Sequence, residues 1–261
     1  METADAADDH TVMADPAPLG RVFRLMRRGL LGDCAPCGRV RLDAIARWLQ
    51  DAAYSDVEDA GVEQAAYWVL RRTRIRVGRF PRFGERCEVR TFCSALGRMW
   101  AERRTTVASA DDGTPLAETV ALWVHLDPVR KLPTPITLAE LEIYGESAAG
   151  RRVPARLRHP RPERAQFESV WSFRHADCDI ADHINNAVYW AALEEVLLAD
   201  RPSGVELAEV DAEIEFRTPA QPGLKHVLVD GRHRWITDPS EGGEIYASID
   251  LMNARTTPGS N

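Results

Sequence analysis

Residues 174–195 read R-H-A-D-C-D-I-A-D-H-I-N-N-A-V-Y-W-A-A-L-E-E. The first half of this stretch concentrates six polar residues in ten positions: Asp177, Asp179, Asp182, His183, Asn185 and Asn186. Its second half is apolar, and residues recur there at the spacing of one helix face: Val188, Ala191, Ala192, Val196 and Ala199. Asn185 or Asn186 is suited to cap this helix. The stretch therefore predicts a polar cluster at the amino end of a buried helix.

Such a cluster has two interpretations. The amino end of a helix offers unpaired N–H groups and the positive end of the dipole, which suit a developing oxyanion. A carboxylate and an imidazole beside it can orient or deprotonate water. However, aspartate and asparagine before a helix are usually caps and turn formers, and a single histidine among them is usually a surface residue. Composition alone favours this structural interpretation over the catalytic one.

Earlier in the chain, a helix and a set of strands are predicted. Residues 42–58 form an amphipathic pattern that ends near Gly61, with this apolar face: Ile45, Trp48, Leu49 and Ala52. After Gly61 the period becomes two, so that Thr73, Ile75 and Val77 alternate with arginines. Further strands are expected at 86–92, 99–108 and 119–126, separated by turns. One helix followed by an antiparallel meander indicates an α+β layer.

The second half of the chain repeats this order of elements. Residues 167–173 are strand-like, the helix that follows Asn186 comes next, and residues 211–217 alternate again. A segment rich in proline and arginine separates the halves. We therefore expect this domain organisation: a disordered acidic tail at 1–19, an N-terminal domain at 20–140, a connector at 141–165 and a C-terminal domain at 166–261.

The order D-x-D-x-x-x-H-x-N-N-x-x-Y in the central stretch resembles the signature of acyl-ACP thioesterases of fatty acid synthesis. Residues 68–94, 97–105 and 121–133 are similar to further segments of that family. The resemblance implies a tandem, or double, hot-dog fold of the α+β class. In this fold each half is a long helix wrapped by a curved antiparallel sheet. It also implies hydrolysis of a fatty acyl thioester of acyl carrier protein (ACP) or coenzyme A.

The resemblance further implies roles for individual residues. Asp179 would act as base or nucleophile, and His183 would orient water or the leaving thiol. Asn186 completes the catalytic set, and backbone N–H groups near Ile184–Asn186 would hold the carbonyl oxygen. The expected substrate contacts are Asn185, Trp48 and Trp68.

Two departures from the family pattern bear on the mechanism. Ala181 stands where plant members carry asparagine, and Pro219 and Ala220 stand where they carry a Glu-Cys pair. Cys178 lies between two motif aspartates, and its side chain should point away from theirs in an extended segment. A protein that binds acyl chains without catalysis is therefore the alternative to a thioesterase. A hot-dog dehydratase fits the residue order less well.

Composition excludes several other classes. The chain carries a net charge of −7, and its start, M-E-T-A-D-A-A-D-D-H, has no apolar core. We therefore expect no nucleic-acid partner and no secretory signal. No apolar run of about 18 residues exists, so no membrane partner and a cytoplasmic location are expected. The pair Cys34 and Cys37 lacks the context of a redox or metal site, so neither a cofactor nor a metal is expected.

Residues 71–104 are strongly basic, with eleven arginines and three acidic residues. Such charges often point to solvent from alternating strands and pair with acids elsewhere in the fold. The alternative is a docking surface for the acidic carrier protein that the resemblance implies as partner, with Arg82 and Arg86 as candidates. Since hot-dog halves pair their sheets edge to edge, we expect a monomer or a homodimer.

Overall fold

The computed structural model describes residues 19–63, 67–199, 201–202, 204–240 and 242–258. Ten strands form one antiparallel sheet in the order β1-β3-β4-β5-β2-β7-β10-β9-β8-β6. The first half of the chain contributes five strands: β1 Phe23–Arg28, β2 Tyr67–Val77, β3 Arg86–Leu96, β4 Trp100–Ser109 and β5 Pro115–Leu126. The second half contributes the other five: β6 Gln166–Phe173, β7 Val205–Phe216, β8 Gly223–Asp230, β9 His233–Thr237 and β10 Ile245–Pro258. The predicted tail falls almost entirely outside the described residues.

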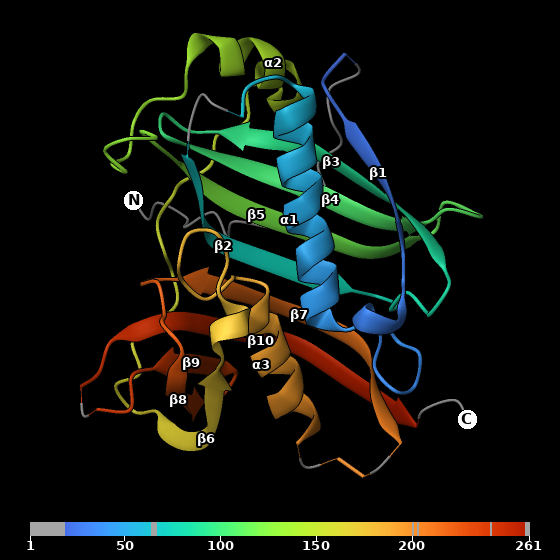
Figure 1. Ribbon diagram of the computed structural model, residues 1–261, viewed down its shortest axis with the longest axis vertical. Helices are drawn as coiled ribbons and strands as arrows, with labels where there is room; N and C mark the ends of the chain where they lie inside the picture. The colour runs from blue at the N-terminus through green and yellow to red at the C-terminus, as the bar shows by residue number, and fades with distance from the viewer. Residues whose placement is uncertain (1–18, 64–66, 200, 203, 241, 259–261) are drawn as a thin grey trace, which may run out of the picture.

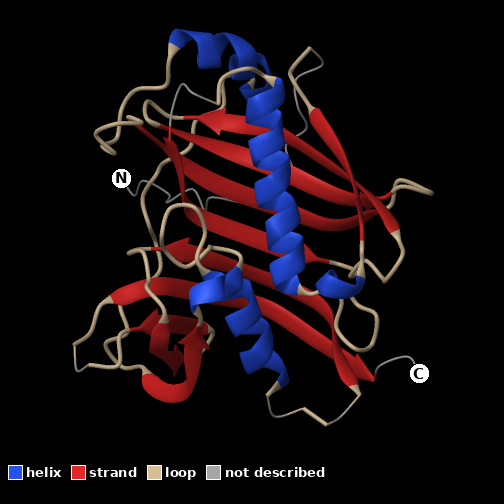
Figure 2. Ribbon diagram, in the orientation of Figure 1, coloured by secondary structure: helices blue, strands red, loops and turns tan. Residues whose placement is uncertain are grey.

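The two halves join where β2 pairs with β7, in a register that runs from Arg72 opposite Glu215 to Val77 opposite Val210. Helix α1 (Leu42–Asp59) lies across the first five strands, and α3 (Val188–Leu198) lies on the same side of the second half (Figures 1 and 2). The α+β architecture, in which each half places a helix against curved antiparallel strands, is therefore confirmed. None of the helices in the described ranges is long and apolar enough to cross a membrane.

Helix α1 buries the face that the sequence predicted, including Ile45, Trp48 and Leu49. For α3 the predicted apolar face was wrong, since only Ala192 of that face is buried. The buried residues of this helix are Tyr189, Trp190, Ala192, Leu193 and Glu194. This helix is apolar on nearly all sides, so the helical period does not single out one face. Contact with α1 on one side and with the aromatic rings of the sheet on the other decides which face is buried.

The segment predicted as a connector begins with a helix, α2 (Leu138–Ala148), which the composition did not reveal. Thr137 starts it with a capping box, because its hydroxyl accepts from the Glu140 N–H and the Glu140 carboxylate accepts from the Thr137 N–H. Ala149 ends it in the left-handed region, at φ 49°. The helix lies over the far end of β3 (Figure 1).

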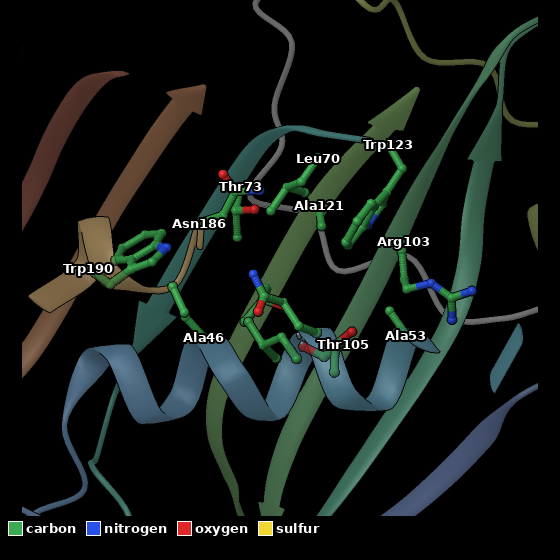
Figure 3. A pocket seen from close by; sticks show the side chains of 14 residues that line it. Ala46, Ala53, Leu70, Thr73, Arg103, Thr105, Ala121, Trp123, Asn186 and Trp190 are labelled. Atoms are coloured by element: carbon green, nitrogen blue, oxygen red, sulfur yellow. Dashed lines mark hydrogen bonds between the residues drawn. The ribbon is translucent and has the colours of Figure 1, made fainter. Parts of the chain in front are cut away.

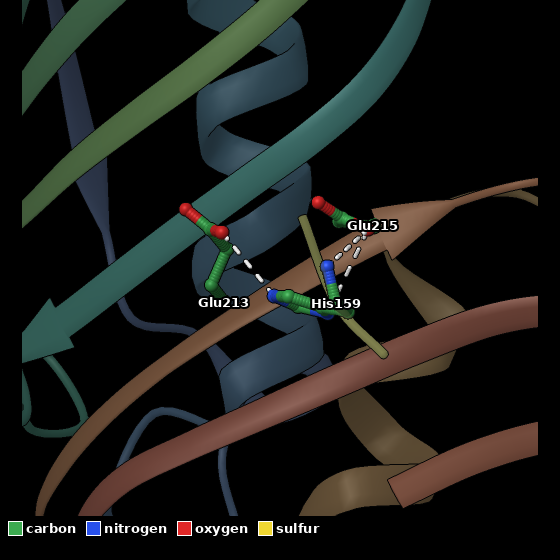
Figure 4. A group of neighbouring side chains, drawn as sticks. All are labelled: His159, Glu213 and Glu215. Carbon is green, nitrogen blue, oxygen red and sulfur yellow. Dashed lines mark hydrogen bonds and ion pairs between the residues drawn. The ribbon is translucent and has the colours of Figure 1, made fainter. Parts of the chain in front are cut away.

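After α2 the chain crosses the outer face of the sheet, where His159 lies between Glu213 and Glu215 of β7 (Figure 4). These three side chains are close enough to ligate a metal ion. The Glu215 carboxylate, however, already accepts from the N–H groups of Arg158 and His159 and from the Arg217 guanidinium. His159 Nε2 lies 3.3 Å from Glu213 Oε1. The cluster therefore fastens the connector to β7.

Candidate active site

The motif forms a short loop that ends where α3 begins. Cys178 pairs with Ile184 in an antiparallel bridge, and the N–H of Asp179 donates to the His183 carbonyl. Asp182 turns the loop with a φ of 59°, a left-handed conformation that aspartate tolerates better than most residues. Asp177 holds the base of the loop, since its carbonyl accepts from the Asn185 N–H. These contacts fix the backbone from which the predicted catalytic side chains project.

The Asp179 carboxylate is held by two hydrogen bonds. Its Oδ1 accepts from the Ala181 N–H at 2.9 Å, and its Oδ2 accepts from the Asn185 side-chain amide at 3.2 Å. His183 Nδ1 lies 3.9 Å from Asp179 Oδ1, and both side chains are partly exposed. The structure therefore brings Asp179, His183 and Asn185 together. The Asn185 amide positions the carboxylate, and its expected contact with substrate stays a prediction.

The helix begins later than the sequence suggested, at Val188, and its N-cap is Ala187 rather than Asn185 or Asn186. Asn185 instead forms a turn just before the helix. Its Oδ1 accepts from the Ala187 N–H at 2.8 Å. Of the predicted oxyanion donors, the Ile184 N–H donates to Ala220 O and the Asn185 N–H donates to Asp177 O. The Asn186 N–H has no acceptor among the described residues, and it is the donor that remains for a carbonyl oxygen.

A cavity of about 530 Å³ opens beside this loop, bounded by α1, α2 and the strands of the first half. Asp179, His183, Asn185 and Asn186 all line it. Much of its remaining wall is apolar: Val57, Val62, Trp68, Leu70, Leu96, Trp123 and Ile136. A volume of this size falls in the range of small-molecule sites, and its apolar wall suits an alkyl chain.

The two tryptophans that were expected to contact substrate differ in position. Trp68 lines the cavity and packs edge-on against the His125 ring at 4.9 Å. Trp48 lies instead in the main hydrophobic core, only 4% exposed, and does not line the cavity. The reason is its place on α1: the cavity follows the later turns of this helix, from Gln50 to Val57, whereas Trp48 precedes them.

Tyr67 is a cavity residue that the sequence did not reveal. Burial, and then the negative charge of Asp179, raise the pKa of its hydroxyl, which favours the neutral form. The Lys131 ammonium lies 3.8 Å from the centre of the Tyr67 ring. In the sequence, Tyr67 is simply the first residue of a strand about 110 positions before the motif. No spacing rule connects Tyr67 with the motif.

Two protein-family models match this chain, one in each half. The model of the acyl-ACP thioesterase N-terminal domain matches residues 30–144, and that of the acyl-ACP thioesterase C-terminal domain matches residues 161–230. The chain belongs to the acyl-ACP thioesterase family. An uncharacterised protein of Mycobacterium tuberculosis is 25% identical over 186 residues, which cover 71% of this chain and 72% of that protein.

Plant relatives and solved structures extend the comparison. A chloroplastic acyl-(acyl-carrier-protein) hydrolase of Cuphea viscosissima is 23% identical over 91% of this chain and 61% of its own. The structure of the 12:0-ACP thioesterase of Umbellularia californica superposes with a TM-score of 0.70, at 19% identity, over 90% of this chain and 98% of that one. A thioesterase structure from Lactobacillus plantarum superposes with a TM-score of 0.73, also at 19% identity, over 92% of this chain and 98% of that one. These likenesses confirm the tandem hot-dog fold.

The positions at which the chain departs from its family lie within the site. Ala220 is fully buried, and its carbonyl accepts from the Ile184 N–H, so the segment that would carry the family's Glu-Cys pair does reach the motif loop. Cys178 packs against the core, while Asp179 lines the cavity. Burial and the neighbouring aspartates raise the pKa of the Cys178 thiol, which disfavours the thiolate. Of these two side chains, Asp179 is therefore the candidate nucleophile or base at the cavity.

The arginines proposed for carrier docking lie far from this cavity. Arg82 forms two hydrogen bonds of 2.8 Å with Glu206, and Arg86 pairs with Asp111 at 3.0 Å. Arg86 begins β3, and it is Leu96 at the other end of this strand that lines the cavity, roughly 30 Å away. Several other arginines of the basic segment also pair with acids: Arg72, Arg74, Arg79, Arg90 and Arg103. The docking role stays a prediction.

Proposed function

We propose that this protein hydrolyses fatty acyl thioesters of acyl carrier protein to the free fatty acid and the carrier thiol. The observation that carries the proposal is the Asp179 carboxylate, held by two hydrogen bonds, at the wall of a largely apolar cavity of about 530 Å³. Membership of the acyl-ACP thioesterase family supports the same reaction and its carrier. Coenzyme A thioesters are the second substrate class to test.

In this mechanism the acyl chain lies along the apolar wall and the thioester carbonyl lies beside the start of α3. The Asn186 N–H, at the positive end of the helix dipole, stabilises the oxygen as negative charge develops. Asp179 takes a proton from water, which attacks the carbonyl carbon, or attacks it directly to form an anhydride that water then cleaves. The C–S bond breaks, and the proton taken from water passes by way of His183 to the leaving thiolate.

Carrier docking at Arg82 and Arg86 belongs to the proposal as an untested element. In its favour, both side chains are substantially exposed, at 42% and 65%. Against it, each already pairs with an acid, and both lie at the strand ends opposite the cavity. The loop after β5 places Arg130 and Lys131 on the surface much nearer the cavity, because Lys131 covers Tyr67. Charge reversal at each place distinguishes the two docking surfaces.

The direct test is Asp179→Asn, assayed by release of free thiol from acyl-ACP and acyl-CoA of several chain lengths. We expect kcat to fall by at least about 100-fold, because the substitution removes both basicity and nucleophilicity. Asp182→Asn is the matched control, since Asp182 lies three residues away, is exposed and does not line the cavity. Asparagine also tolerates its left-handed backbone. Equal rates for the two variants would remove Asp179 from the mechanism.

The alternative is a protein that binds acyl chains without cleaving them. The absence of the family's Glu-Cys pair is the observation that favours it, since one carboxylate must then perform the chemistry. Binding of acyl-ACP without thiol release by the wild-type protein would select this alternative. A dehydratase would instead release water from a 3-hydroxyacyl thioester and leave the thioester intact, so it would form an enoyl thioester and no free thiol.

A further inference from the structure

Four threonines lie under α1 on the helix-facing side of the first half of the sheet, and three of them bond within it. The Thr91 hydroxyl donates to the Arg104 carbonyl and lies 2.8 Å from the Thr105 hydroxyl. The Thr119 hydroxyl donates to the Thr105 carbonyl. Thr73, only 4% exposed, is different, because its hydroxyl has no partner among the described residues. A buried hydroxyl without a partner is costly, so its position calls for an explanation.

The Thr73 side chain lines a small chamber of about 20 Å³ between α1 and the sheet (Figure 3). The indole of Trp123 lines the same chamber, and its Nε1–H also has no acceptor among the described residues. Gln50 adds a side-chain amide to the wall. A chamber of this volume holds one water-sized group, and Thr73, Trp123 and Gln50 all line it.

The chamber lies next to the reaction centre. Asn186, whose N–H is the donor proposed for the thioester carbonyl, lines both the chamber and the 530 Å³ cavity. Leu70, Arg103 and Trp123 are also shared by the two spaces. An acyl chain whose carbonyl lies at Asn186 therefore passes the chamber within its first few carbons.

We propose that this chamber binds an oxygen atom carried by the acyl chain close to the thioester, so that hydroxyacyl and oxoacyl thioesters are the preferred substrates. The inference rests on the proposed function for the thioester itself. The indole N–H can only donate, and a threonine hydroxyl can donate or accept. A hydroxyl can therefore bond both groups at once, and a keto oxygen can accept from both. An unsubstituted alkyl chain offers neither group a hydrogen-bond partner.

The test compares matched thioesters of one chain length: unsubstituted, 3-hydroxy and 3-oxo. For the wild-type protein we expect kcat/KM to be at least about 10-fold higher for the oxygenated chains. Thr73→Val keeps the shape and removes the hydroxyl, so the preference should fall to about 3-fold or less. Trp123→Phe is the second variant, because it removes the N–H from the other side. The Kd values of non-hydrolysable amide analogues of the same chains are measured in parallel.

Thr91→Val is the matched control. Its hydroxyl bonds within the sheet and does not line the chamber, so this variant should melt at a lower temperature and keep the wild-type preference. Thr73→Val should melt at the wild-type temperature or above it, because it removes an unpaired polar group. This contrast separates recognition of the chain from general damage to the fold.

Each result decides the matter. Equal kcat/KM and equal Kd for substituted and unsubstituted chains would mean that the chamber holds only water, and would overturn the inference while leaving the proposed function intact. A preference that survives both Thr73→Val and Trp123→Phe would also overturn it. Tighter binding of oxygenated analogues without any thiol release, lost in Thr73→Val, would uphold the oxygen site and refute the hydrolase.

Discussion

Removing the charge of Glu194 should destabilise the whole protein while leaving the cavity residues in place. This side chain projects from α3, and its Oε1 pairs with the Arg39 guanidinium, which is 1% exposed. Its Oε2 accepts from the Leu42 N–H at 2.7 Å, at the first turn of α1. One carboxylate thus neutralises a buried cation and satisfies a free N–H of the helix in the other half of the chain.

The magnitude follows from what each substitution leaves behind. Glu194→Gln keeps the shape and can still accept from Leu42, but it leaves Arg39 buried without a counter-charge. Breaking a buried pair in this way costs about 3–5 kcal/mol. That is a large part of a typical unfolding free energy of about 5–15 kcal/mol. The double variant Arg39→Met with Glu194→Gln removes both charges, keeps an acceptor for the Leu42 N–H and should recover most of the loss.

The assay is urea unfolding followed by far-UV circular dichroism, with Glu195→Gln as the control. Glu195 is the next residue along α3 and is exposed, so its loss should change stability by less than about 0.5 kcal/mol. The reasoning is refuted if Glu194→Gln costs less than about 1 kcal/mol, or if the double variant is as unstable as the single one.

Three further outcomes are expected. Asn185→Ala should lower kcat by about 10-fold, because it removes the amide that holds the proposed catalytic carboxylate of Asp179, with acyl-ACP turnover as the measurement. Lys131→Glu should lower kcat/KM for acyl-ACP more than Arg86→Glu does, and the difference should shrink between about 50 and 500 mM salt; the reverse order would favour the more distant arginines. Partial burial opposes a lower pKa for Asp177, but hydrogen bonds to Arg174 lower it below the ordinary value of 3.8. The ionised Asp177 therefore stabilises the folded protein above about pH 3.8, and this contribution is lost as the pH falls through the pKa of the folded state. In Asp177→Asn the unfolding free energy should lose this part of its pH dependence between about pH 2 and 5.

The sequence predicted the fold well in segments where apolar residues recur with a single period, either that of a strand or that of a helix. The strand at Thr73, Ile75 and Val77 follows its alternation, and the face of α1 was correct because its other face is polar. The face of α3 was wrong because its stretch is apolar on most sides, so that packing decides. Helix α2 was missed because Gly145 and the prolines after it resemble a connector, while the capping box at Thr137 is a weak local signal.

The candidate site was predicted in its local part only. Asp179, His183 and the two asparagines lie within eight residues, so one loop necessarily brings them together. Which N–H groups remain available at the start of α3 depends on Ala220 and Asp177, whose contacts the motif does not encode. Tyr67 and the chamber beside Thr73 arise where distant strands and α1 converge, which no spacing within the sequence reveals.

The positions at which the chain departs from the family pattern bear on how the Asp179 carboxylate and its loop are held in place. Where plant relatives have asparagine, the backbone N–H of Ala181 already donates to Asp179 Oδ1, so a hydrogen bond to the carboxylate persists without that side chain. Where they have a Glu-Cys pair, the Ala220 carbonyl holds the Ile184 N–H and so keeps the loop in place. Loop geometry is thus maintained by backbone groups, and in the proposed mechanism the chemistry is left to Asp179 and His183. The proposed mechanism therefore requires only one activated water and one oxyanion donor, and both are groups that accelerate acyl transfer.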